Sequence, residues 1–418
     1  MWTKERAQKS IYQFGELSKI QQVELLSTMN EQFPVETFDA HLSHRRKAIQ
    51  NLETSRLLLD GATQHYPAVL SADNVVASAK NLAGFGIVFT AGGDGERLRL
   101  SLEEQGASAH SLADFTKATY ALPDFYNEFG SLHINMSVLA SICKEYKIEI
   151  PVVITTGPKG SVTARVIPKV LKEYNNWGLK NVIVVQQDER LHFTQDEQVV
   201  YIIEDEKISL VTHPDESGGP IVKLKESVCG QSPLEIMKKN GCSKVIILQG
   251  TAVYDPAVIF KIAAASKNHD GIGVGISRSA FPSDDPYGTY VSVEKDGPQR
   301  VCILEQDVRN ESTRELTNSD NGDFLPYNTG FYAFDIDILM NNTLPDYATP
   351  PKQVSPGLEK SAKIGYAATD LLPMADNPAI LTISPESYGV IKSAADLVKL
   401  SQLAKLLKLD VICAESGL

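Results

Sequence analysis

Three glycines lie within four positions in the stretch Gly92-Gly93-Asp94-Gly95, and Arg97 follows two residues later. Glycines let the backbone approach a ligand closely, so that successive N–H groups can converge on phosphate oxygens. The spacing matches neither G-x-G-x-x-G nor G-x-x-x-x-G-K-[ST], which argues against a dinucleotide site and a P-loop. Glycine content alone is equally compatible with a tight turn that binds nothing. Arg97 favours the phosphate interpretation, because an arginine fork at such a turn suits a pyrophosphate.

Four short runs rich in apolar and β-branched residues supply the elements that would position this loop. Each run is continuous rather than alternating, which is typical of strands buried on both faces. Helical patterns lie between the runs, and this alternation predicts a mainly parallel sheet with helices on both faces. The loop follows the first run directly, at the carboxyl end of a strand, where doubly wound sheets bind ligands. The expected strands are 86–89, 151–154, 182–185 and 245–248, and the expected helices include 136–146 and 164–174.

Both ends of the chain have helical patterns. Apolar residues recur at spacings of three and four near the N-terminus, as an amphipathic helix requires, and a second segment covers 38–59 before Asp60-Gly61. Residues 394–407 are expected to form a closing helix. We therefore expect a helical N-terminal region (1–80), an α/β body (81–393) and a C-terminal helical segment (394–418). The apolar residues of the first helix are Ile20, Val23, Leu25, Leu26 and Met29.

Two segments of the body are interpreted from their turn residues. Residues 287–293 and 300–305 have the pattern of a hairpin around Lys295-Asp296-Gly297, which we assign to an antiparallel subdomain on the substrate side. Residues 310–324 are polar and rich in Gly, Asn, Ser and Asp, so they are expected to form a loop.

Composition narrows the class of protein. The chain has 418 residues with 40 Lys and Arg against 52 Asp and Glu, a formal charge of −12. Binding nucleic acid or an anionic membrane by bulk charge needs a broad cationic face, so neither partner is expected. There is no apolar run of about 18 residues and no signal-peptide pattern. The five cysteines form no C-x-x-C pair, so neither a disulfide framework nor a zinc site is indicated. A cytoplasmic protein is expected.

The glycine loop also resembles a family signature. The stretch Ala91-Gly92-Gly93-x-Gly95-x-Arg97-Leu98 is similar to the G-G-x-G-T-R-L motif of sugar-phosphate nucleotidyltransferases. This resemblance implies a Rossmann-like, GT-A-like α/β fold, with a mainly parallel mixed sheet flanked by helices and a helical N-terminal region. It implies that 81–393 is the nucleotidyltransferase catalytic domain.

Further motifs resemble the UTP-dependent branch, the UDP-glucose and UDP-N-acetylglucosamine pyrophosphorylases. They follow the family order from about Gly84 to Leu407, which makes the match more specific than any single motif. Lys117 lies where the family has its first catalytic lysine, although Thr116 replaces the usual Pro. Lys392 aligns with the F-x-P-x-K segment of the second one. The matching nucleotide-side residues are Ala91, Gly92, Gly93, Gly95, Gln187, Pro214, Gly218 and Gly219, and the matching sugar-side residues are Gly288, Glu305, Asn328 and Gly330.

The resemblance implies the reaction of UTP with a sugar 1-phosphate to give a UDP-sugar and pyrophosphate. In-line phosphoryl chemistry asks the protein mainly to position anions and neutralise charge. Arg97 would hold the departing pyrophosphate, Lys117 the UTP phosphates, and Lys392 the sugar phosphate or the α-phosphate. Mg²⁺ is the implied cofactor. The sugar and the oligomeric state stay open.

Two departures from the family pattern bear on activity. Glu96 replaces the common loop Thr. The fourth core strand normally ends in a metal-binding aspartate, whereas Gly250 or Thr251 stands there, so the metal ligand is unknown and Asp94 and Asp255 are the candidates. A divergent or non-catalytic nucleotide-sugar-binding protein on the same scaffold is therefore the second hypothesis.

The same residues also allow interpretations without a functional role. Most lysines are solvated surface groups. Gly218-Gly219 can form a plain turn, Asn328 can be a turn residue before Gly330, and only one of Gln186 and Gln187 can reach a base. A glycosyltransferase is a third hypothesis. Its usual D-x-D motif has one counterpart, at 335–337, which follows an apolar strand and is expected to begin a helix instead.

Overall fold

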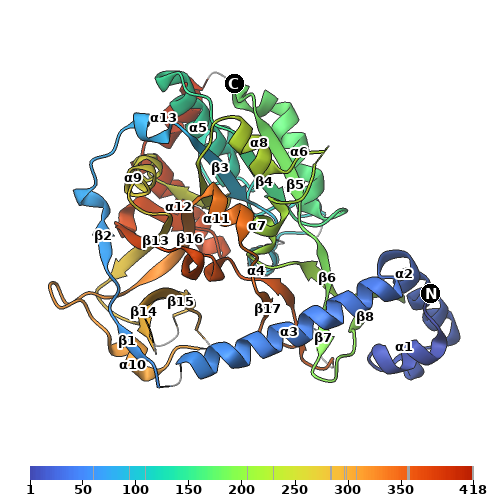
Figure 1. Ribbon diagram of the computed structural model, residues 1–418. Helices are drawn as coiled ribbons and strands as arrows, with labels where there is room; N and C mark the ends of the chain where they lie inside the picture. The colour runs from blue at the N-terminus through green and yellow to red at the C-terminus, as the bar shows by residue number, and fades with distance from the viewer. Residues whose placement is uncertain are drawn as a thin grey trace. The chain divides into compact units, whose positions relative to one another are not determined.

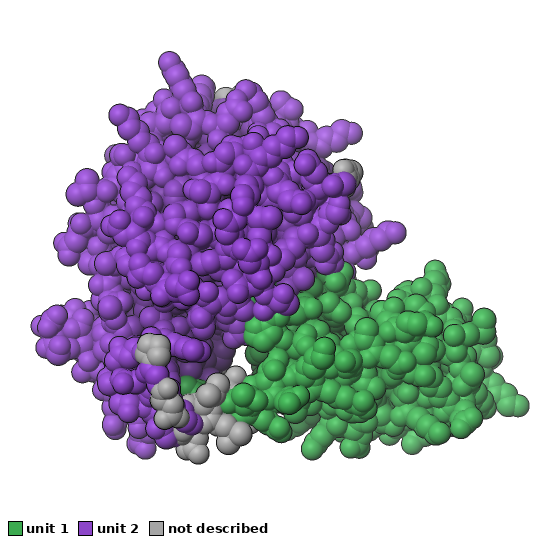
Figure 2. Space-filling view, in the orientation of Figure 1, with its two compact units in different colours: residues 1–60, 188–219, 344–368 green, residues 61–187, 220–343, 369–418 purple. Residues whose placement is uncertain are grey.

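The computed structural model divides the chain into two compact units, each built from separate stretches of sequence (Figure 2). The smaller unit contains 1–60, 188–219 and 344–368, and the larger contains 61–187, 220–343 and 369–418. The described residues are 1–59, 61–93, 95–108, 110–204, 206–228, 230–282, 285–295, 297, 299–306, 308–354 and 358–416, without the side chains of 55–58. Asp60, Asp94, Cys229 and Asp296 therefore lie outside the described residues.

The larger unit is built on one mixed sheet flanked by helices (Figure 1). The strand order along its main path is β2-β20-β13-β16-β11-β3-β4-β5, and all these neighbours are parallel except where β16 pairs with β13 and β11. The bounds are β2 (Val69–Ser71), β20 (Pro378–Ile383), β13 (Gly271–Arg278), β16 (Phe324–Asp335), β11 (Lys244–Gln249), β3 (Phe85–Thr90), β4 (Val152–Thr156) and β5 (Val182–Gln186).

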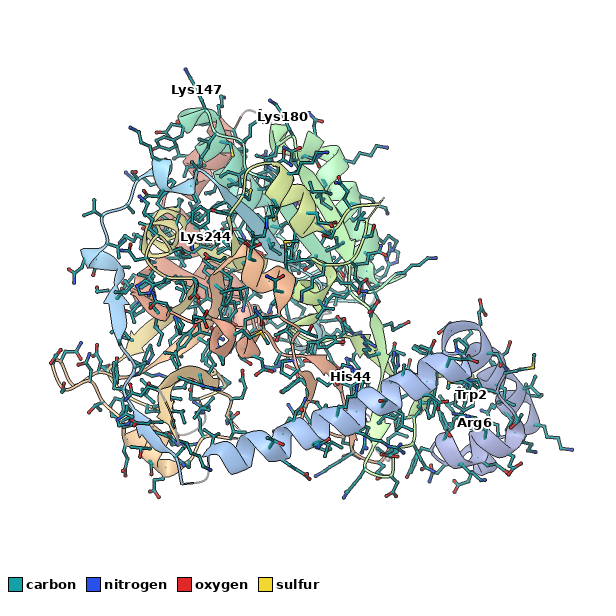
Figure 3. All side chains as sticks on the ribbon, in the orientation of Figure 1. Trp2, Arg6, His44, Lys147, Lys180 and Lys244 are labelled. Atoms are coloured by element: carbon teal, nitrogen blue, oxygen red, sulfur yellow. The ribbon has the colours of Figure 1, made fainter. Side chains whose placement is uncertain are left out.

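The four strands expected from apolar runs are confirmed as β3, β4, β5 and β11, adjacent and parallel. The continuous apolar sequence of β4 follows from burial along its whole length, whereas β5, at the end of the strand order, is only partly buried. An ion pair between Lys244, labelled in Figure 3, and Asp335 joins β11 to β16 where the two residues are in register. The expected hairpin is confirmed as β14 (Thr289–Glu294) and β15 (Arg300–Leu304).

Helices and short strands complete the larger unit. The expected helices are confirmed as α5, α6 and α12, and 335–337 does lead into α11. Among the described residues, no helix is long and apolar enough to cross a membrane. The helices are α4 (Glu96–Glu104), α5 (Ser131–Tyr146), α6 (Val162–Glu173), α8 (Pro233–Lys239), α9 (Ala257–Ala265), α10 (Glu311–Glu315), α11 (Ile336–Asn341), α12 (Ala394–Leu406) and α13 (Leu409–Glu415), and the short strands are β1 (Thr63–His65), β12 (Ala252–Tyr254) and β21 (Tyr388–Val390).

The smaller unit combines the N-terminal helices with short strands from two later segments. Its core includes Trp2, Phe14, Phe38 and Phe193, with the Trp2 and Phe38 rings 4.9 Å apart. The N-terminal helices are α1 (Lys4–Ser10), α2 (Lys19–Gln32) and α3 (Val35–Leu59). The strands are β6 (Glu189–Leu191), β7 (Phe193–Thr194), β8 (Tyr201–Glu204), β9 (Lys207–Leu210), β10 (Thr212–Pro214), β17 (Asp346–Ala348), β18 (Ser361–Ala362) and β19 (Ile364–Tyr366), and the helix α7 (Gly219–Lys223) begins at the last residue of the second segment.

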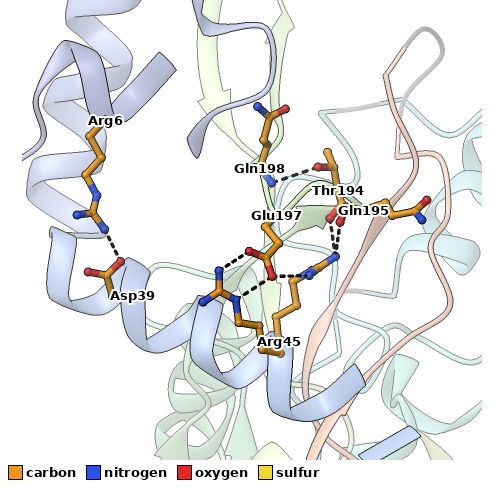
Figure 4. A network of polar contacts seen from close by, with 8 residues as sticks. Arg6, Asp39, Arg45, Thr194, Gln195, Glu197 and Gln198 are labelled. Carbon is orange, nitrogen blue, oxygen red and sulfur yellow. Dashed lines mark hydrogen bonds and ion pairs between the residues drawn. The ribbon is translucent and has the colours of Figure 1, made fainter. Parts of the chain in front are cut away.

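A polar network ties α3 to the segment after β7 (Figure 4). Arg45 Nη2 donates hydrogen bonds to the carbonyl oxygens of Thr194 (2.8 Å) and Gln195 (2.9 Å). Arg45 and Arg46 both pair with Glu197, at 3.3 and 2.5 Å. The Arg45 side chain is 7% exposed and that of Arg46 is 62% exposed, so the two contacts differ in environment.

Two buried histidines of the smaller unit are neutral. The Nε2 of His213 accepts a hydrogen bond from the Ile364 N–H (3.2 Å), which requires that nitrogen to be unprotonated. The His192 ring lies 4.8 Å from it, edge to face. Burial lowers the pKa of His213 to about 2 and that of His192 to about 3, with neighbouring positive charge as a smaller cause. Protonation of either ring therefore destabilises the folded state.

Some expectations differ from the structure. The expected loop 310–324 contains α10, which begins because the Asn310 side chain accepts a hydrogen bond from the Thr313 N–H. In α2, Leu25 and Met29 are buried, but Ile20 and Val23 are exposed. The division at residues 80 and 393 ran along the chain, whereas the units are discontinuous and the segment 394–418 belongs to the larger one.

Candidate functional site

The glycine loop connects β3 to α4 in the larger unit. The Ala91 N–H donates a hydrogen bond to the Thr155 carbonyl (2.9 Å), so the loop starts from the sheet edge. Gly93 is exposed, and a Cβ built there would meet no atom within 4 Å. Gly95 is the N-cap of α4 and has φ of +68°, a conformation that L side chains rarely adopt. The loop therefore presents open backbone at Gly93, and Arg97 follows in the first turn of the helix.

Lys117 lies beside the end of this loop. A Cβ on Gly95 would stand 3.1 Å from the Lys117 Cβ, which shows how closely the two segments approach. The buried Thr116 holds the turn, because its hydroxyl lies 2.7 Å from that of Thr119 and accepts a hydrogen bond from the Thr119 N–H (3.1 Å). Thr116 thus fixes the turn that follows it by hydrogen bonding.

Lys392 lies between β21 and α12. The Asp396 carboxylate accepts hydrogen bonds from the Lys392 N–H (3.0 Å) and the Ser393 N–H (2.8 Å), which caps the helix and fixes the lysine backbone. The Lys392 Nζ lies 3.3 Å from the centre of the Tyr287 ring. The ammonium is therefore held over an aromatic face, and it forms no salt bridge with the residues that the structure describes.

The structure brings Arg97, Lys117 and Lys392 into one electrostatic cluster. The pKa of Lys117 is lowered to about 8, first by burial and then by the positive charges of Lys392 and Arg97. The pKa of Lys392 is also lowered to about 8, first by burial and then by Arg97. The positive charges of Lys392 and Arg97 thus disfavour the charged form of Lys117, and that of Arg97 disfavours the charged form of Lys392, an effect that a bound anion would relieve.

The predicted sugar-side residues also lie together. The Asn328 N–H donates a hydrogen bond to the Gly288 carbonyl (2.8 Å), and a Cβ on Gly288 would come within 3.0 Å of Glu305 Oε1. The negative charge of Glu305 raises the pKa of Lys392. Burial and Arg97 lower that pKa by more, so the net pKa is lowered. The sugar-side residues and the cation cluster therefore belong to one region.

The Asn328 amide has a fixed orientation. Its Oδ1 accepts hydrogen bonds from the Tyr290 hydroxyl and the Gly330 N–H, both at 2.9 Å. Its Nδ2 donates to the Tyr332 hydroxyl at 2.7 Å. Because the oxygen is engaged twice and the amide nitrogen carries a second proton, this side chain can offer a ligand a donor.

Gln249 is a residue that the sequence reasoning missed. It ends β11, and its side chain occupies the space where a Cβ on Gly330 would lie. Gly330 has φ of +76°, a conformation that favours glycine. Tyr287 was also missed as an individual residue, because its ring acquires a role only when Lys392, far along the chain, folds over it.

The described residues do not form a metal site. No group of three or more His, Cys, Asp or Glu able to hold a metal occurs among them. The end of β11 carries Gln249 and Gly250, and the Asp255 carboxylate accepts a hydrogen bond from the Ala257 N–H (2.8 Å) at the start of α9. Asp94, the other candidate, lies outside the described residues.

The predicted nucleotide-side residues are divided between the units. In the larger unit, a Cβ on Gly92 would overlap the amide oxygen of Gln187, which is buried, whereas Gln186 is exposed. Gln187 therefore lies against the glycine loop. Its N–H donates a hydrogen bond to the Thr156 carbonyl at 3.0 Å.

Pro214, Gly218 and Gly219 belong to the smaller unit. Pro214 ends β10, and the Gly218 N–H donates a hydrogen bond to the Tyr366 carbonyl (2.7 Å). A Cβ on Gly218 would stand 2.7 Å from that carbonyl carbon, and one on Gly219 would overlap Asp215. Close packing within the unit thus explains both glycines, and their contact with a base stays a prediction.

Comparison with known proteins identifies solved structures of similar fold. No protein-family model matches the sequence, and no curated protein matches it. The uridine diphosphate N-acetylglucosamine pyrophosphorylase of Trypanosoma brucei aligns with a TM-score of 0.66 at 14% identity, over 92% of this chain and 79% of that one. A putative UDP-N-acetylglucosamine pyrophosphorylase of Entamoeba histolytica gives 0.61 at 15% identity, over 80% and 84%.

UDP-glucose pyrophosphorylase of Leishmania major, solved as a mutant in complex with UDP-glucose, gives a TM-score of 0.61 at 14% identity, over 92% of this chain and 79% of that one. The likeness extends over most of each chain, while the identities are too low to carry substrate or residue roles. The chain therefore has the fold of the UDP-sugar pyrophosphorylases.

Proposed function

We propose that this protein is a nucleotidyltransferase that transfers the uridylyl group of UTP to a sugar 1-phosphate. The observation that carries the proposal is the cluster of Arg97, Lys117 and Lys392 beside the glycine loop, with both lysine pKa values lowered to about 8. Such a cluster suits the meeting of two polyanions. The pyrophosphorylases of similar fold include one solved in complex with UDP-glucose, which supports the same substrate class here.

The reaction forms one bond and breaks one. An oxygen of the sugar phosphate attacks the α-phosphorus of UTP, and the bond from that phosphorus to the β-bridging oxygen breaks. The electron pair leaves with pyrophosphate, and no proton has to move because the attacking phosphate is already anionic. The protein's task is to bring the anions together in line and to neutralise the charge that accumulates.

The three cations divide this task in the proposal. Arg97, at the start of α4, binds the departing pyrophosphate with the open backbone of Gly93. Lys117 binds the UTP phosphates, and Lys392 binds the sugar phosphate or the α-phosphate. An arriving anion restores the pKa of both lysines towards the ordinary value, so substrate binding relieves the repulsion built into the free site.

The sugar lies against the cluster of Gly288, Glu305, Asn328 and Gly330. Asn328 donates from its Nδ2 to a sugar oxygen, and Glu305 accepts from a hydroxyl. Gln187 is the candidate for contact with the base. The Mg²⁺ dependence implied by the resemblance stays a prediction, and no step of the proposed reaction is routed through a metal.

Pyrophosphate release from UTP, measured with glucose 1-phosphate or N-acetylglucosamine 1-phosphate as acceptor, tests the proposal. Release is expected only when both substrates are present. Lys117→Gln and Lys392→Gln should each lower kcat/KM by about 10²–10³-fold, as the loss of one fixed donor does in other sites. Lys405→Gln is the matched control, because its exposed side chain lies in the last turn of α12.

A thermal-shift measurement in parallel separates the two main hypotheses. If UTP and UDP-sugars raise the melting temperature but no sugar 1-phosphate supports turnover, the protein is a nucleotide-sugar-binding protein and the enzyme proposal is wrong. The observation that favours this second hypothesis is that the described carboxylates do not gather into a group able to hold a metal ion.

A further inference from the structure

Tyr287 stands in direct contact with the Lys392 ammonium. The Nζ lies 3.3 Å from the ring centre, well within the distance at which an aromatic face attracts a cation. Both groups are half-buried, so the attraction is less screened than at an open surface. The ring therefore stabilises both the charge and the position of the ammonium.

The ring itself is held by a second aromatic side chain. Tyr327, in β16, lies with its ring centre 4.6 Å from that of Tyr287, at an interplanar angle of 33°. The Tyr287 N–H also donates a long hydrogen bond (3.4 Å) to Asp285 Oδ1. The ring is thus fixed from β16 and through its own backbone.

Asp285 is clamped by two arginines. Its Oδ2 accepts hydrogen bonds from Arg278 Nη1 (2.6 Å) and Arg309 Nη1 (2.5 Å), and Arg309 Nη2 donates to the Asp285 carbonyl (2.6 Å). The three side chains are 4%, 9% and 0% exposed for Asp285, Arg278 and Arg309. Burial raises the pKa of Asp285, but the arginines outweigh it and the net pKa is lowered. A buried, fully charged clamp therefore anchors the backbone two residues from the Tyr287 ring.

The charges around Lys392 show why such support matters. Arg97 opposes the charge of Lys392, while Asp285, Asp396 and Glu305 favour it. Lys117 is a further positive charge near Lys392, as shown by the effect of the Lys392 charge, which lowers the pKa of Lys117. Charges of both signs therefore act on the flexible Lys392 ammonium, so its position depends on a fixed contact. The Tyr287 ring supplies an uncharged contact that does not compete with an anionic ligand for a salt bridge.

We propose that Tyr287 is a positioning residue, which holds the Lys392 ammonium in place for an incoming phosphate through its ring face. This inference rests on the function proposed above for Lys392. The attraction requires only the ring face, so the hydroxyl is dispensable and the ring is not.

Tyr287→Leu and Tyr287→Phe test the inference, with Tyr146→Leu as a control that removes an exposed tyrosine on α5. Loss of the ring should lower kcat/KM about tenfold and move the alkaline limb of its pH profile roughly 0.5–1 pH unit lower, because the charged lysine loses a favourable contact. Tyr287→Phe should keep the wild-type limb. An unchanged limb in Tyr287→Leu, or an equal shift in Tyr287→Phe, would overturn the inference.

A second readout does not depend on turnover. In protein labelled with ¹³C-lysine, the Lys392 ε-methylene protons should be shifted upfield by the ring current in the wild type and in Tyr287→Phe, but not in Tyr287→Leu. The resonance is assigned by its loss in Lys392→Arg. Absence of this shift in an active enzyme would contradict the inference alone. Its presence in a protein without uridylyltransferase activity would instead contradict the proposed function.

Discussion

Replacing Arg97 with glutamine should change the pH dependence of the two lysines as well as the rate. The pKa of Lys117 falls from 10.5 to about 8, and Arg97 is the smallest of the three causes that lower it. Arg97 therefore accounts for at most about a third of the lowering. For Lys392 it is the second cause after burial. Removing this charge should raise both pKa values, that of Lys117 by less than about 1 pH unit, equivalent to under about 1.4 kcal/mol.

The sign of the effect follows from the role of the lysines. Both must be protonated to bind phosphate, so activity is lost as the pH rises through their pKa. A higher pKa moves this alkaline limb to higher pH, while the loss of the Arg97 contact to pyrophosphate lowers kcat/KM by about 10²–10³-fold. The variant is thus expected to be slower yet active to a higher pH.

The assay is the profile of kcat/KM, which reports the free enzyme, from about pH 6.5 to 10. Arg99→Gln is the matched control, because Arg99 lies two residues away on α4 and pairs with Glu103 at 3.5 Å. A limb that stays in place or moves to lower pH in Arg97→Gln would refute the electrostatic reasoning. An equal upward movement in Arg99→Gln would show that the effect is not specific to the cluster.

Three further predictions concern the fold and the sugar side. Arg45→Met should lower the free energy of unfolding by about 2–4 kcal/mol, because two carbonyls lose their donor, while exposed Arg46→Met should cost under about 1 kcal/mol; urea denaturation measures both. His192 and His213 have lowered pKa values, so the free energy of unfolding should be highest above about pH 6.5, where both histidines are neutral in either state. Below that pH it should fall, by about 2 kcal/mol per histidine at pH 5. A pH-independent free energy of unfolding between pH 7 and 5 would contradict this. Asn328→Ala should raise KM for the sugar 1-phosphate about tenfold with little change in KM for UTP, whereas a rise in KM for UTP alone would place Asn328 elsewhere.

The central sheet could be predicted from the sequence because burial on both faces leaves a local signature. Continuous apolar runs identified β3, β4, β5 and β11, and the glycine loop was placed correctly at the end of β3. The hairpin was predicted for a similar reason, since a turn between two β-rich runs is local. These features depend on neighbours within about ten residues along the chain.

The remaining features depend on contacts between distant segments. Ile20 and Val23 fit the helical period of α2, but the packing of the smaller unit leaves them exposed, and periodicity alone cannot assign which face is covered. The joining of 1–60 with 188–219 and 344–368 has no local signature either. Tyr287 gains its contact only when residue 392 folds over it.

The most direct test of uridylyl transfer follows two labels in UTP with the wild-type protein and a sugar 1-phosphate. Label at the α-phosphorus should appear in the UDP-sugar, and label at the γ-phosphorus should appear only in pyrophosphate, in equal amounts. Release of inorganic phosphate from the γ-position, or α-label that reaches no sugar nucleotide with any sugar 1-phosphate, would contradict the account.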